Sequence, residues 1–464
     1  MDVKGKRVLV VGLGKSGIAS ALFLADQGAR VAVSDTKSEE ELHDEIPLLL
    51  DRGIGVEAGY HGERIFKEQE LIVISPGVPS DVPQLEQARQ AGIPVIGEVE
   101  LAAQYLKGQI VAITGSNGKT TTTTLAGDII AASGQKTLVG GNIGTPAISF
   151  VEKASDDTWI VLEVSSFQLE TIETFHPKIA VVLNVTPDHL DRHHTFENYA
   201  AAKARIFENQ TGSDFAVLNA DDVTCAAMAD KTQARVYWFS RQHFVEHGAF
   251  VRGDEIFWRD AGSEQVIMPV SEIVLKGAHN VENVLSSICV GMLAGVDPAD
   301  IRRAVLHFKA VEHRLEYVAT IRGVEYYNDS KATNVDATIK ALESFPGGIH
   351  LILGGKDKGS DYSLLNPLLE QRVKRVYTIG AAAPRIELQI KGTQVATAST
   401  LDTAVRRASE SATPGDVVLL APACASFDQF VSYEHRGRVF KDLVKQLELR
   451  ELQHTGSHRS GGNE

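Results

Sequence analysis

Residues 110–121 read IVAITGSNGKTT, an apolar run that leads into a glycine-rich turn and then into a stretch of threonines. The apolar run predicts a buried β-strand, and residues 122–132 predict a helix, so the turn joins a strand to a helix. In such a turn the glycines let backbone N–H groups face phosphate oxygens, and the helix N-terminus adds positive potential. Lys119 is then placed to reach the β- and γ-phosphates, and the Thr120 hydroxyl to bind Mg²⁺. The stretch therefore predicts a nucleoside triphosphate site.

The turn departs from the common phosphate-loop pattern at one position. The pattern G-x-x-x-x-G-K-[ST] has a glycine five places before its second glycine, whereas this chain has Ile113 five places before Gly118. Gly115 instead opens a shorter loop. A turn that binds nothing is the alternative, but the flanking strand and helix favour a phosphate loop.

The composition limits the possible functions. The chain has 464 residues, 43% hydrophobic and 23% charged, which is enough for about three domains. Its net charge of −14 argues against a nucleic-acid-binding protein, which would carry a basic surface. Cys225, Cys289 and Cys424 are far apart, so we expect neither disulfides nor a cysteine metal site. Apolar runs stay well below the roughly 18 residues of a membrane span, so we expect a cytoplasmic chain.

The order of apolar runs predicts an α/β fold in three domains. We expect a Rossmann-like domain over residues 1–98, a central P-loop domain with a mostly parallel sheet over residues 99–309, and a second Rossmann-like, doubly wound domain over residues 310–464. Predicted strands cover residues 7–11, 31–34, 71–75, 95–96, 159–164, 178–184, 324–327, 350–353, 375–379 and 417–420, with a strand-rich stretch over 215–269. Predicted helices cover residues 18–27, 84–91, 196–209, 301–308, 336–344 and 401–411.

A second glycine-rich turn follows the first predicted strand. Residues 8–17 read VLVVGLGKSG, in which the glycines have dinucleotide-binding spacing. Asp35 ends the next predicted strand, where a carboxylate can accept a hydrogen bond from a ribose hydroxyl. These residues alone allow an NAD-dependent dehydrogenase. The pyrophosphate of another nucleotide fits equally well, because the turn recognises phosphates and not nicotinamide. A turn kept only for helix–strand packing is the third alternative.

Three segments after the phosphate loop carry groups suited to Mg²⁺. Glu163 lies in the apolar run WIVLEVSSFQLE, where a carboxylate is costly to bury unless it meets a partner or a cation. The run KIAVVLNVTPDHLDRHH places Asn184, Asp188 and His189 after its strand, at the edge where parallel sheets hold ligands. Lys203 lies on a predicted amphipathic helix. Taken alone, His189 is more often a capping or surface residue, and Lys203 a solvated one.

Several segments, in this order along the chain, resemble the ATP-dependent Mur ligases of peptidoglycan synthesis: TGSNGKTT, EVSSFQLE, NVTPDHLDRH, AAKARIF, HNVENVLSS, HRLE and NDSKATN. The resemblance covers nearly the whole chain. NDSKATN and the segment LLAPACASFDQFVSYEHRGRVF are most similar to members that add D-glutamate to UDP-N-acetylmuramoyl-L-alanine. The alternatives are another Mur-type ligase, a folylpolyglutamate-type ligase, or a P-loop switch that only hydrolyses ATP.

The resemblance implies that ATP drives amide formation. A carboxylate is a poor electrophile, so transfer of the γ-phosphoryl group to it gives an acyl phosphate that an amine can attack. Lys119 and the loop would hold the phosphates, and Thr120 and Glu163 would bind one Mg²⁺. His189 and Lys203 resemble a second metal site in which the lysine is carbamylated, because an ammonium group cannot ligate Mg²⁺. We expect an enzyme that acts as a monomer, without nucleic-acid partners.

The resemblance also implies binding residues for each ligand. Those for ATP are Gly115, Ser116, Asn117, Gly118, Lys119, Thr120, Thr121, Asn280, Asn283, Arg314 and Asp329. Those for the UDP-linked substrate are Gly14, Lys15, Ser16, Asp35, Thr36, Ser75, Pro76, Gly77 and Asn142. Those for D-glutamate are Lys331, Thr333, Lys358, Ser426 and Tyr433, with Lys356 as the alternative to Lys358.

These residues are distributed over different predicted domains. The phosphate loop lies in the second domain, whereas Arg314, Asp329 and Lys331 lie in the third. We therefore expect the third domain to rotate onto the second when ligands bind, about a hinge near residues 308–311. Closure would exclude water, which otherwise hydrolyses an acyl phosphate.

Overall fold

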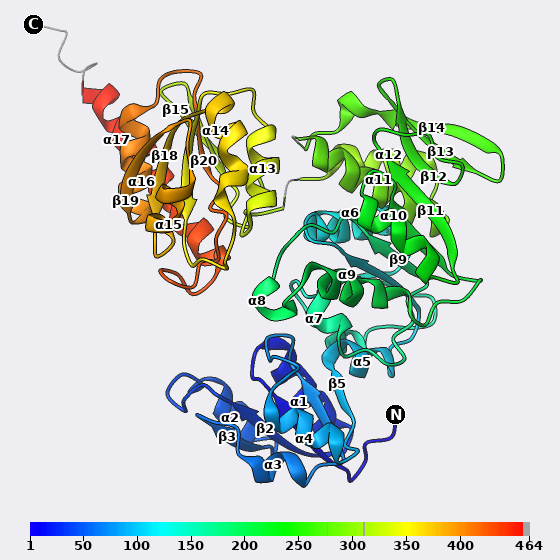
Figure 1. Ribbon diagram of the computed structural model, residues 1–464. Helices are drawn as coiled ribbons and strands as arrows, with labels where there is room; N and C mark the ends of the chain where they lie inside the picture. The colour runs from blue at the N-terminus through cyan, green and yellow to red at the C-terminus, as the bar shows by residue number, and fades with distance from the viewer. Residues whose placement is uncertain (276, 310, 458–464) are drawn as a thin grey trace, which may run out of the picture. The chain divides into compact units, whose positions relative to one another are not determined.

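The computed structural model of the protein describes residues 1–275, 277–309 and 311–457, with side chains as far as Glu451 (Figure 1). Its contacts divide the chain into two compact units. The first comprises Met1–Pro187, Arg192–Glu272 and Glu282–Phe308, and the second comprises Asp188–Asp191, Ile273–Val281 and the described residues from Lys309 onward. Within these described ranges no helix has the length and apolar character needed to cross a membrane. The expected hinge includes residue 310, which lies outside the described residues, and the three domain borders stay predictions.

The first sheet has five parallel strands in the order β3-β2-β1-β4-β5, which confirms the α/β prediction for this part of the chain. The strands are β1 (Arg7–Val11), β2 (Arg30–Asp35), β3 (Gly55–Ala58), β4 (Leu71–Ile74) and β5 (Val95–Gly97). The helices are α1 (Lys15–Asp26), α2 (Glu45–Leu50), α3 (Glu63–Lys67) and α4 (Pro83–Gln90). The sequence pattern does not predict β3, α2 or α3, because these segments are too short to show a periodic apolar pattern.

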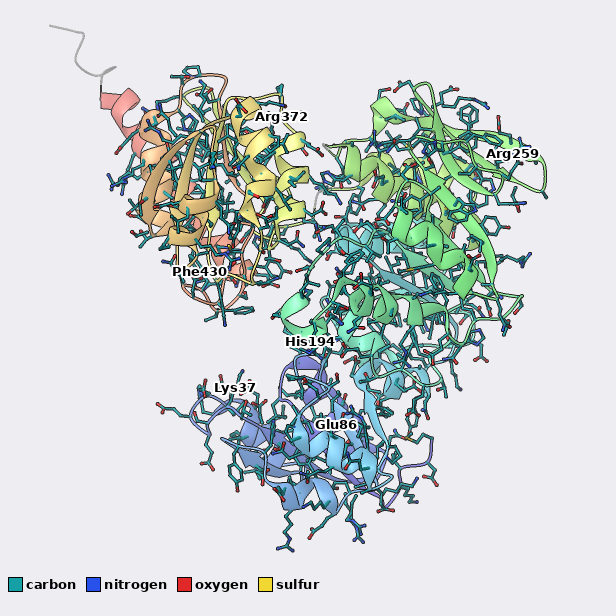
Figure 2. The ribbon with its side chains drawn as sticks, in the orientation of Figure 1. Lys37, Glu86, His194, Arg259, Arg372 and Phe430 are labelled. Atoms are coloured by element: carbon teal, nitrogen blue, oxygen red, sulfur yellow. The ribbon has the colours of Figure 1, made fainter. Side chains whose placement is uncertain are left out.

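Strand β1 is buried on both faces, which explains its continuous apolar sequence. Val8 and Val10 join one hydrophobic cluster, while Leu9 and Val11 join another. Successive side chains of a strand point to opposite faces, so a strand covered on both sides has no polar alternation. Charged side chains such as Lys37 and Glu86 instead lie on the outside of this layer (Figure 2). The strand order reverses beside β1, and its carboxyl end is therefore an edge where the sheet can hold a ligand.

The second sheet has nine strands in the order β14-β13-β12-β11-β10-β9-β6-β8-β7. Neighbours from β7 to β12 are parallel, and β13 and β14 are antiparallel. The strands are β6 (Gln109–Thr114), β7 (Thr137–Gly141), β8 (Trp159–Glu163), β9 (Ile179–Val182), β10 (Phe215–Asn219), β11 (Arg235–Ser240), β12 (Gly248–Arg252), β13 (Glu255–Asp260) and β14 (Ser263–Pro269). This confirms the mostly parallel central sheet.

The helices associated with this sheet include two whose predicted bounds were wrong. Helix α6 begins at Lys119 rather than at residue 122, because it starts directly after the last glycine of the loop. Helix α9 ends at Ala204, and a 3₁₀ turn over Arg205–Phe207 follows in place of a continuous helix to residue 209. The helices are α5 (Glu98–Ala103), α6 (Lys119–Ala132), α7 (Ser166–Leu169), α8 (Leu190–His193), α9 (Phe196–Ala204), α10 (Val223–Ala226), α11 (Ala278–Leu293) and α12 (Pro298–His307).

The third sheet has six strands in the order β15-β16-β20-β17-β18-β19. Five are parallel, which confirms the doubly wound pattern, although the sequence pattern predicts only four of them and not β19. Strand β15, also not predicted, is an antiparallel edge strand, which is common in otherwise parallel sheets. The strands are β15 (Glu316–Ile321), β16 (Val324–Asn328), β17 (Ile349–Gly354), β18 (Val373–Ile379), β19 (Gln394–Ser399) and β20 (Val417–Leu420). The helices are α13 (Val335–Glu343), α14 (Asn366–Arg372), α15 (Ala383–Gln389), α16 (Leu401–Ser411) and α17 (Tyr433–Ser457).

Candidate active site

The predicted phosphate loop is a tight turn between β6 and α6. Gly115 and Gly118 have φ angles of 153° and 86°, which side chains other than glycine rarely adopt. Space is also short, since a Cβ on Gly118 would collide with the Asn283 side chain, and a Cβ on Gly115 would lie 3.0 Å from the Leu183 Cβ. The two glycines are therefore required by backbone geometry and by the close approach of neighbouring elements.

The turn after β9 braces this loop. The Asn184 side chain accepts a hydrogen bond from the Asn117 N–H (2.8 Å), and its backbone oxygen accepts one from the Ser116 N–H (2.9 Å). The Ser116 hydroxyl donates to the Thr186 carbonyl at 2.9 Å. The first amides of the loop are thus engaged within the protein. The position of Asn184 at the end of a strand predicts that it lies near the site, but not that it supports the loop.

The second half of the loop offers a positive helix end. Gly118 is the N-cap of α6, and no side chain among the described residues caps it. The Lys119 ammonium group donates to the Gly115 carbonyl (2.8 Å) and the Ser116 carbonyl (2.9 Å), so it lies over the loop. The helix N-terminus and the lysine together favour an anion at this turn.

Glu163 lies at the end of β8 beside this helix. Its side chain is 2% exposed and accepts hydrogen bonds from the Thr120 hydroxyl (2.7 Å) and from the Asn142 amide (2.9 Å). Hydroxyl and carboxylate oxygens are ligands that Mg²⁺ prefers, so the chemistry of the Thr120–Glu163 pair fits this ion. The structure places the Asn142 side chain against Glu163, and its contact with the UDP-linked substrate stays a prediction.

Lys203 lies beneath the same loop. Its side chain is 1% exposed, and its ammonium nitrogen donates to the Gly115 carbonyl at 2.9 Å and lies 4.5 Å from the centre of the Tyr199 ring. Lys203 is therefore not the solvated helix lysine that its sequence alone favours. A buried amine next to a phosphate loop is suited to interaction with a nearby charged ligand.

His189 lies in the second compact unit, on the short segment Asp188–Asp191. Its backbone has a positive φ of 54°, and its Nε2 lies 3.5 Å from the Asp188 carboxylate. Asp188 also accepts from the Asn334 side chain at 2.9 Å and pairs with Lys358 at 3.6 Å. Lys203 belongs to the first unit, so a metal site shared by His189 and Lys203 stays a prediction.

The predicted nucleotide contacts of the third sheet lie close to one another. Asp329 is buried, and burial raises its pKa to about 6, while the positive charge of Arg314 acts in the opposite direction. Its carboxylate accepts from the Leu315 N–H at 3.2 Å. The Arg314 Nε–H is buried without a hydrogen-bond acceptor among the described residues. Asp329 is thus buried within electrostatic reach of the half-buried Arg314.

The two predicted adenine contacts both lie on α11, which begins in the second unit and continues in the first. Asn283 belongs to the first unit, and its side-chain oxygen accepts from the Thr122 hydroxyl at 3.3 Å. Asn280 belongs to the second unit, where its N–H donates to the Gly277 carbonyl. Asn283 is therefore next to the phosphate loop, whereas the contact of either asparagine with adenine stays a prediction.

A buried arginine that sequence analysis missed joins two of the segments that carry predicted D-glutamate residues. Arg436 is fully buried and donates to the Ser330 hydroxyl (3.0 Å), the Ser330 carbonyl (2.8 Å) and the Cys424 carbonyl (3.1 Å). It thereby joins the segment containing Lys331 to the segment containing Ser426. Burial lowers the pKa of Arg436 to about 10. The stretch EHRGRVF contains a second arginine, Arg438, and nothing in the sequence alone marks Arg436 as the buried one.

The remaining predicted D-glutamate residues have mixed surroundings. The Lys331 ammonium lies 5.2 Å from the centre of the Tyr433 ring, and the Thr333 N–H donates to the Lys331 carbonyl. The Lys356 backbone pairs with Ala425, but its side chain is exposed. The Lys358 side chain is 18% exposed. The choice between Lys356 and Lys358 as a glutamate contact stays open.

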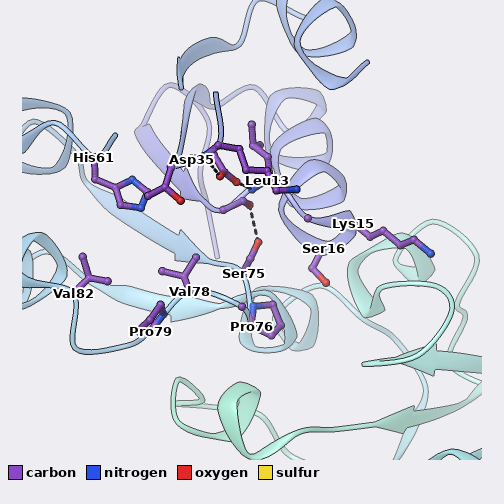
Figure 3. A pocket seen from close by; sticks show the side chains of 15 residues that line it. Leu13, Lys15, Ser16, Asp35, His61, Ser75, Pro76, Val78, Pro79 and Val82 are labelled. Atoms are coloured by element: carbon purple, nitrogen blue, oxygen red, sulfur yellow. Dashed lines mark hydrogen bonds between the residues drawn. The ribbon is translucent and has the colours of Figure 1, made fainter. Parts of the chain in front are cut away.

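A cavity of about 550 Å³ lies at the carboxyl end of the first sheet (Figure 3). The Asp35 carboxylate accepts from the Leu13 N–H (2.5 Å) and the Lys37 N–H (2.8 Å), and the Ser75 hydroxyl donates to the Gly12 carbonyl (2.7 Å). These bonds fix the glycine-rich turn to its two neighbouring strands. The residues that line the cavity are Gly12, Leu13, Gly14, Lys15, Ser16, Asp35, Thr36, Lys37, His61, Ser75, Pro76, Gly77, Val78, Pro79 and Val82.

The cavity contains every predicted residue for the UDP-linked substrate except Asn142. Sequence analysis missed His61, whose imidazole lies 2.8 Å from the Ser34 hydroxyl. Burial lowers the pKa of His61, so this wall of the cavity favours a neutral ring. Isolated histidines in a loop carry little sequence signal, and only the fold brings this one to the glycine-rich turn.

Comparison with known proteins agrees with this arrangement. Models of the MurD-like Mur ligase N-terminal domain, the Mur ligase middle domain and the Mur ligase glutamate ligase domain match residues 6–97, 113–291 and 313–424. The chain belongs to the Mur ligase family. This membership answers the question left open by the glycine-rich turn, and the dehydrogenase alternative is set aside.

Individual relatives are similar over nearly their full length. A protein of Koribacter versatilis named UDP-N-acetylmuramoylalanine–D-glutamate ligase is 70% identical over 96% of this chain and 99% of its own. One of Acidobacterium capsulatum with the same name is 61% identical over 96% of this chain and 97% of its own. The crystal structure of MurF ligase from Thermotoga maritima in complex with ADP has a TM-score of 0.58 at 18% identity, covering 97% of this chain and 96% of that one, and it shares the fold.

Proposed function

We propose that this chain is an ATP-dependent ligase that joins D-glutamate to UDP-N-acetylmuramoyl-L-alanine in cytoplasmic peptidoglycan precursor synthesis, and that it acts as a monomer. The observation that carries the proposal is 70% identity, over 96% of the chain, to a relative named for this reaction. Three features of the structure support it, one beside each sheet: a glycine-lined cavity, a glycine-rich turn with a lysine, and a buried arginine bonded to a serine.

ATP would bind at the turn between β6 and α6. Because the Ser116 and Asn117 amides already bond to Asn184, the phosphate contacts would come chiefly from residues 118–121 and from the Lys119 ammonium. Lys119 would leave the loop carbonyls to reach the transferring phosphoryl group, where its charge stabilises the transition state. Asn280, Asn283, Arg314 and Asp329 would complete the nucleotide site.

Mg²⁺ would be held by Thr120 and Glu163, and a second ion by His189 and a carbamylated Lys203. Bound there, the ions would neutralise charge on the phosphates. The residues of the chain have separate tasks. Glu163 would exchange its hydrogen bond from Thr120 for the ion, and the bond from Asn142 would keep the carboxylate oriented. The buried position of Lys203 excludes water from the amine that would take up CO₂.

The UDP moiety would lie in the cavity of about 550 Å³, with its pyrophosphate at the N-terminus of α1 and a ribose hydroxyl at Asp35. D-glutamate carries two carboxylates, so it calls for cations and hydroxyls rather than an apolar pocket. Lys331, Thr333, Ser426, Tyr433 and Lys358 would provide them. The amine of this amino acid would then attack the acyl phosphate formed on the UDP-linked substrate, with release of phosphate.

A coupled assay tests the proposal. We expect phosphate release from ATP only when UDP-N-acetylmuramoyl-L-alanine and D-glutamate are both present. Replacement of D-glutamate by L-glutamate or L-lysine should abolish the stimulated turnover. Equal turnover with L-glutamate or L-lysine would overturn the assignment to this member of the family, and slow hydrolysis indifferent to both substrates would indicate a nucleotide switch instead.

A further inference from the structure

One wall of the cavity at the first sheet is the loop that follows β4. Residues 75–79 of this loop line the cavity, and Pro76, Val78 and Pro79 lie along one side of it in Figure 3. The loop has no regular secondary structure, and prolines at 76 and 79 remove two backbone donors. Its carbonyl groups therefore need donors from elsewhere if the wall is to keep one shape.

Arg192 supplies two of these donors. It lies on α8 and donates from Nη1 to the Pro76 carbonyl and from Nη2 to the Val78 carbonyl, both at 3.0 Å. The guanidinium lies 3.8 Å from the centre of the Phe167 ring, and the side chain is only 18% exposed. A planar fork that bonds two carbonyls and stacks on an aromatic ring is a geometry that lysine cannot reproduce.

A carboxylate next to Arg192 holds the same loop at a second point. Glu170 accepts from the Ser80 hydroxyl at 3.1 Å and pairs with Arg192 at 3.5 Å. Its other oxygen lies 3.2 Å from His193 Nδ1, and His193 Nε2 lies 2.9 Å from the Ser166 hydroxyl. Ser166 begins α7, three residues after Glu163. Polar contacts thus run from the wall of the first cavity to Ser166, three residues after the Mg²⁺ candidate Glu163.

We infer that Arg192 is a positioning residue that holds the wall of the UDP pocket in its binding shape. The inference rests on the proposed function for the identity of the ligand. Without the two Arg192 bonds, residues 76–79 would move more freely, and UDP binding would have to order them again. Arg192 does not line the cavity itself, so its loss should weaken UDP binding and leave the ATP site unchanged.

The experiment compares UDP affinity in the full-length enzyme and its variants by isothermal titration calorimetry. We expect Arg192→Lys and Arg192→Met to bind UDP about ten- to a hundredfold more weakly, the scale of losing hydrogen bonds from a charged group. The affinity for ADP should change less than about twofold. Hydrogen exchange at the Gly77 and Val78 amides of the free enzyme should become faster. If Arg192 stabilised only other parts of the protein, exchange at these two amides would not change.

Two further variants keep the test decisive. Arg372→Lys is the matched control, because Arg372 donates to the Glu343 (3.0 Å) and Phe345 (2.7 Å) carbonyls in the other unit, and we expect wild-type UDP affinity. Ser80→Ala removes only the bond to Glu170 and should weaken UDP binding severalfold even if the Arg192 variants fail to fold. The inference would be overturned if the folded Arg192 variants bound UDP as tightly as the wild type, or lost affinity for UDP and ADP equally. If those variants do not fold, unchanged UDP affinity of Ser80→Ala would overturn it. A wild-type enzyme that does not bind UDP would overturn it together with the substrate assignment, whereas a failed ligase assay with normal UDP binding would affect only the proposed function.

Discussion

The turns after β1 and β6 are both glycine-rich and both lead from a parallel strand into a helix, yet their surroundings differ. The turn after β1 is fixed by the Asp35 carboxylate and opens onto a cavity of about 550 Å³. The turn after β6 is braced by Asn184 and faces the Lys119 ammonium and the buried Glu163 carboxylate. Under the proposed function, the first turn would only hold a nucleotide, whereas the second would hold one whose phosphate is transferred. The difference lies in the charged groups around each turn, Asp35 beside the first and Lys119 and Glu163 beside the second.

Loss of the proposed Mg²⁺ ligands at the second turn should have the largest effect. We expect Glu163→Ala and Thr120→Ala to lower Mg²⁺-dependent turnover by about two to four orders of magnitude, the range for a preorganised group that stabilises transition-state charge. UDP affinity should stay at the wild-type level, which separates the two turns. Near-normal turnover of Glu163→Ala at low Mg²⁺ would contradict the ligand role.

The buried lysine beneath the same turn gives the next prediction. We expect intact-protein mass spectrometry under mild conditions, or a crystal structure, to show a CO₂ adduct on Lys203, and turnover to depend on bicarbonate. Lys203→Arg keeps the charge but cannot become a carbamate, so turnover should fall by roughly a hundredfold or more. A well-defined unmodified ammonium in active, metal-loaded enzyme would refute this.

A substitution at the first turn should affect UDP binding and leave the ATP site nearly unchanged. Asp35→Asn keeps the size of the side chain but removes a charge that accepts from two backbone N–H groups. We expect UDP to bind about ten- to a hundredfold more weakly, by calorimetry, and the KM for ATP to change less than about twofold. A comparable change in the KM for ATP would mean that the two turns are not independent.

The smallest expected effect concerns α5, which follows the first sheet and carries two contrasting carboxyl groups. Burial raises the pKa of Glu98 to about 7, although its carboxylate accepts from the Ile148 N–H. The pKa of Glu100 is lowered, because hydrogen bonds from Thr174, Glu173 and Gln104 outweigh its burial. The two groups therefore titrate in opposite directions from their ordinary values.

The sign of each pKa shift determines a pH dependence of stability. The folded protein keeps the Glu98 carboxyl protonated up to about pH 7, so the free energy of unfolding decreases as pH rises toward 7. Because glutamine does not titrate, Glu98→Gln should make this decrease smaller by about 1–3 kcal/mol. Glu100 stabilises the fold above its unfolded pKa and loses that effect in acid, so Glu100→Gln should be destabilised at neutral pH. Urea unfolding at pH 5 and pH 8 measures the Glu98 effect, and comparison of pH 8 with about pH 3 measures the Glu100 effect. The same pH dependence of the free energy of unfolding in both variants would contradict the assignment.

Much of the fold could be predicted because parallel strands carry their signal locally. Strands β1 and β20 have their predicted bounds, as does helix α16, since each is a continuous apolar or amphipathic run. Strand β3 could not be predicted, because the segment GVEA has few apolar residues and is held in place by β2. The antiparallel direction of β15 is likewise decided by its hairpin with β16 and not by its own composition.

Among the site residues, those within motifs could be identified from their order along the chain. The spacing of residues 115–121 and the end of the strand at Glu163 predict phosphate and Mg²⁺ chemistry, because backbone geometry and ligand type are local properties. The sequence by itself thus determined the class of chemistry to expect and which residues form the glycine-rich turn between β6 and α6.

Tertiary structure alone decided which groups support that chemistry. The supporting contacts all join residues that are distant along the chain. Asn184 bonds the phosphate loop, and Asn142 bonds Glu163. Arg192 holds the carbonyls of Pro76 and Val78, and Arg436 joins two segments of the third sheet. No sequence motif indicates these contacts, because the pairing of strands and the burial of side chains depend on the whole fold. The physical reason is that a buried charge or carbonyl must find its partner wherever packing places one.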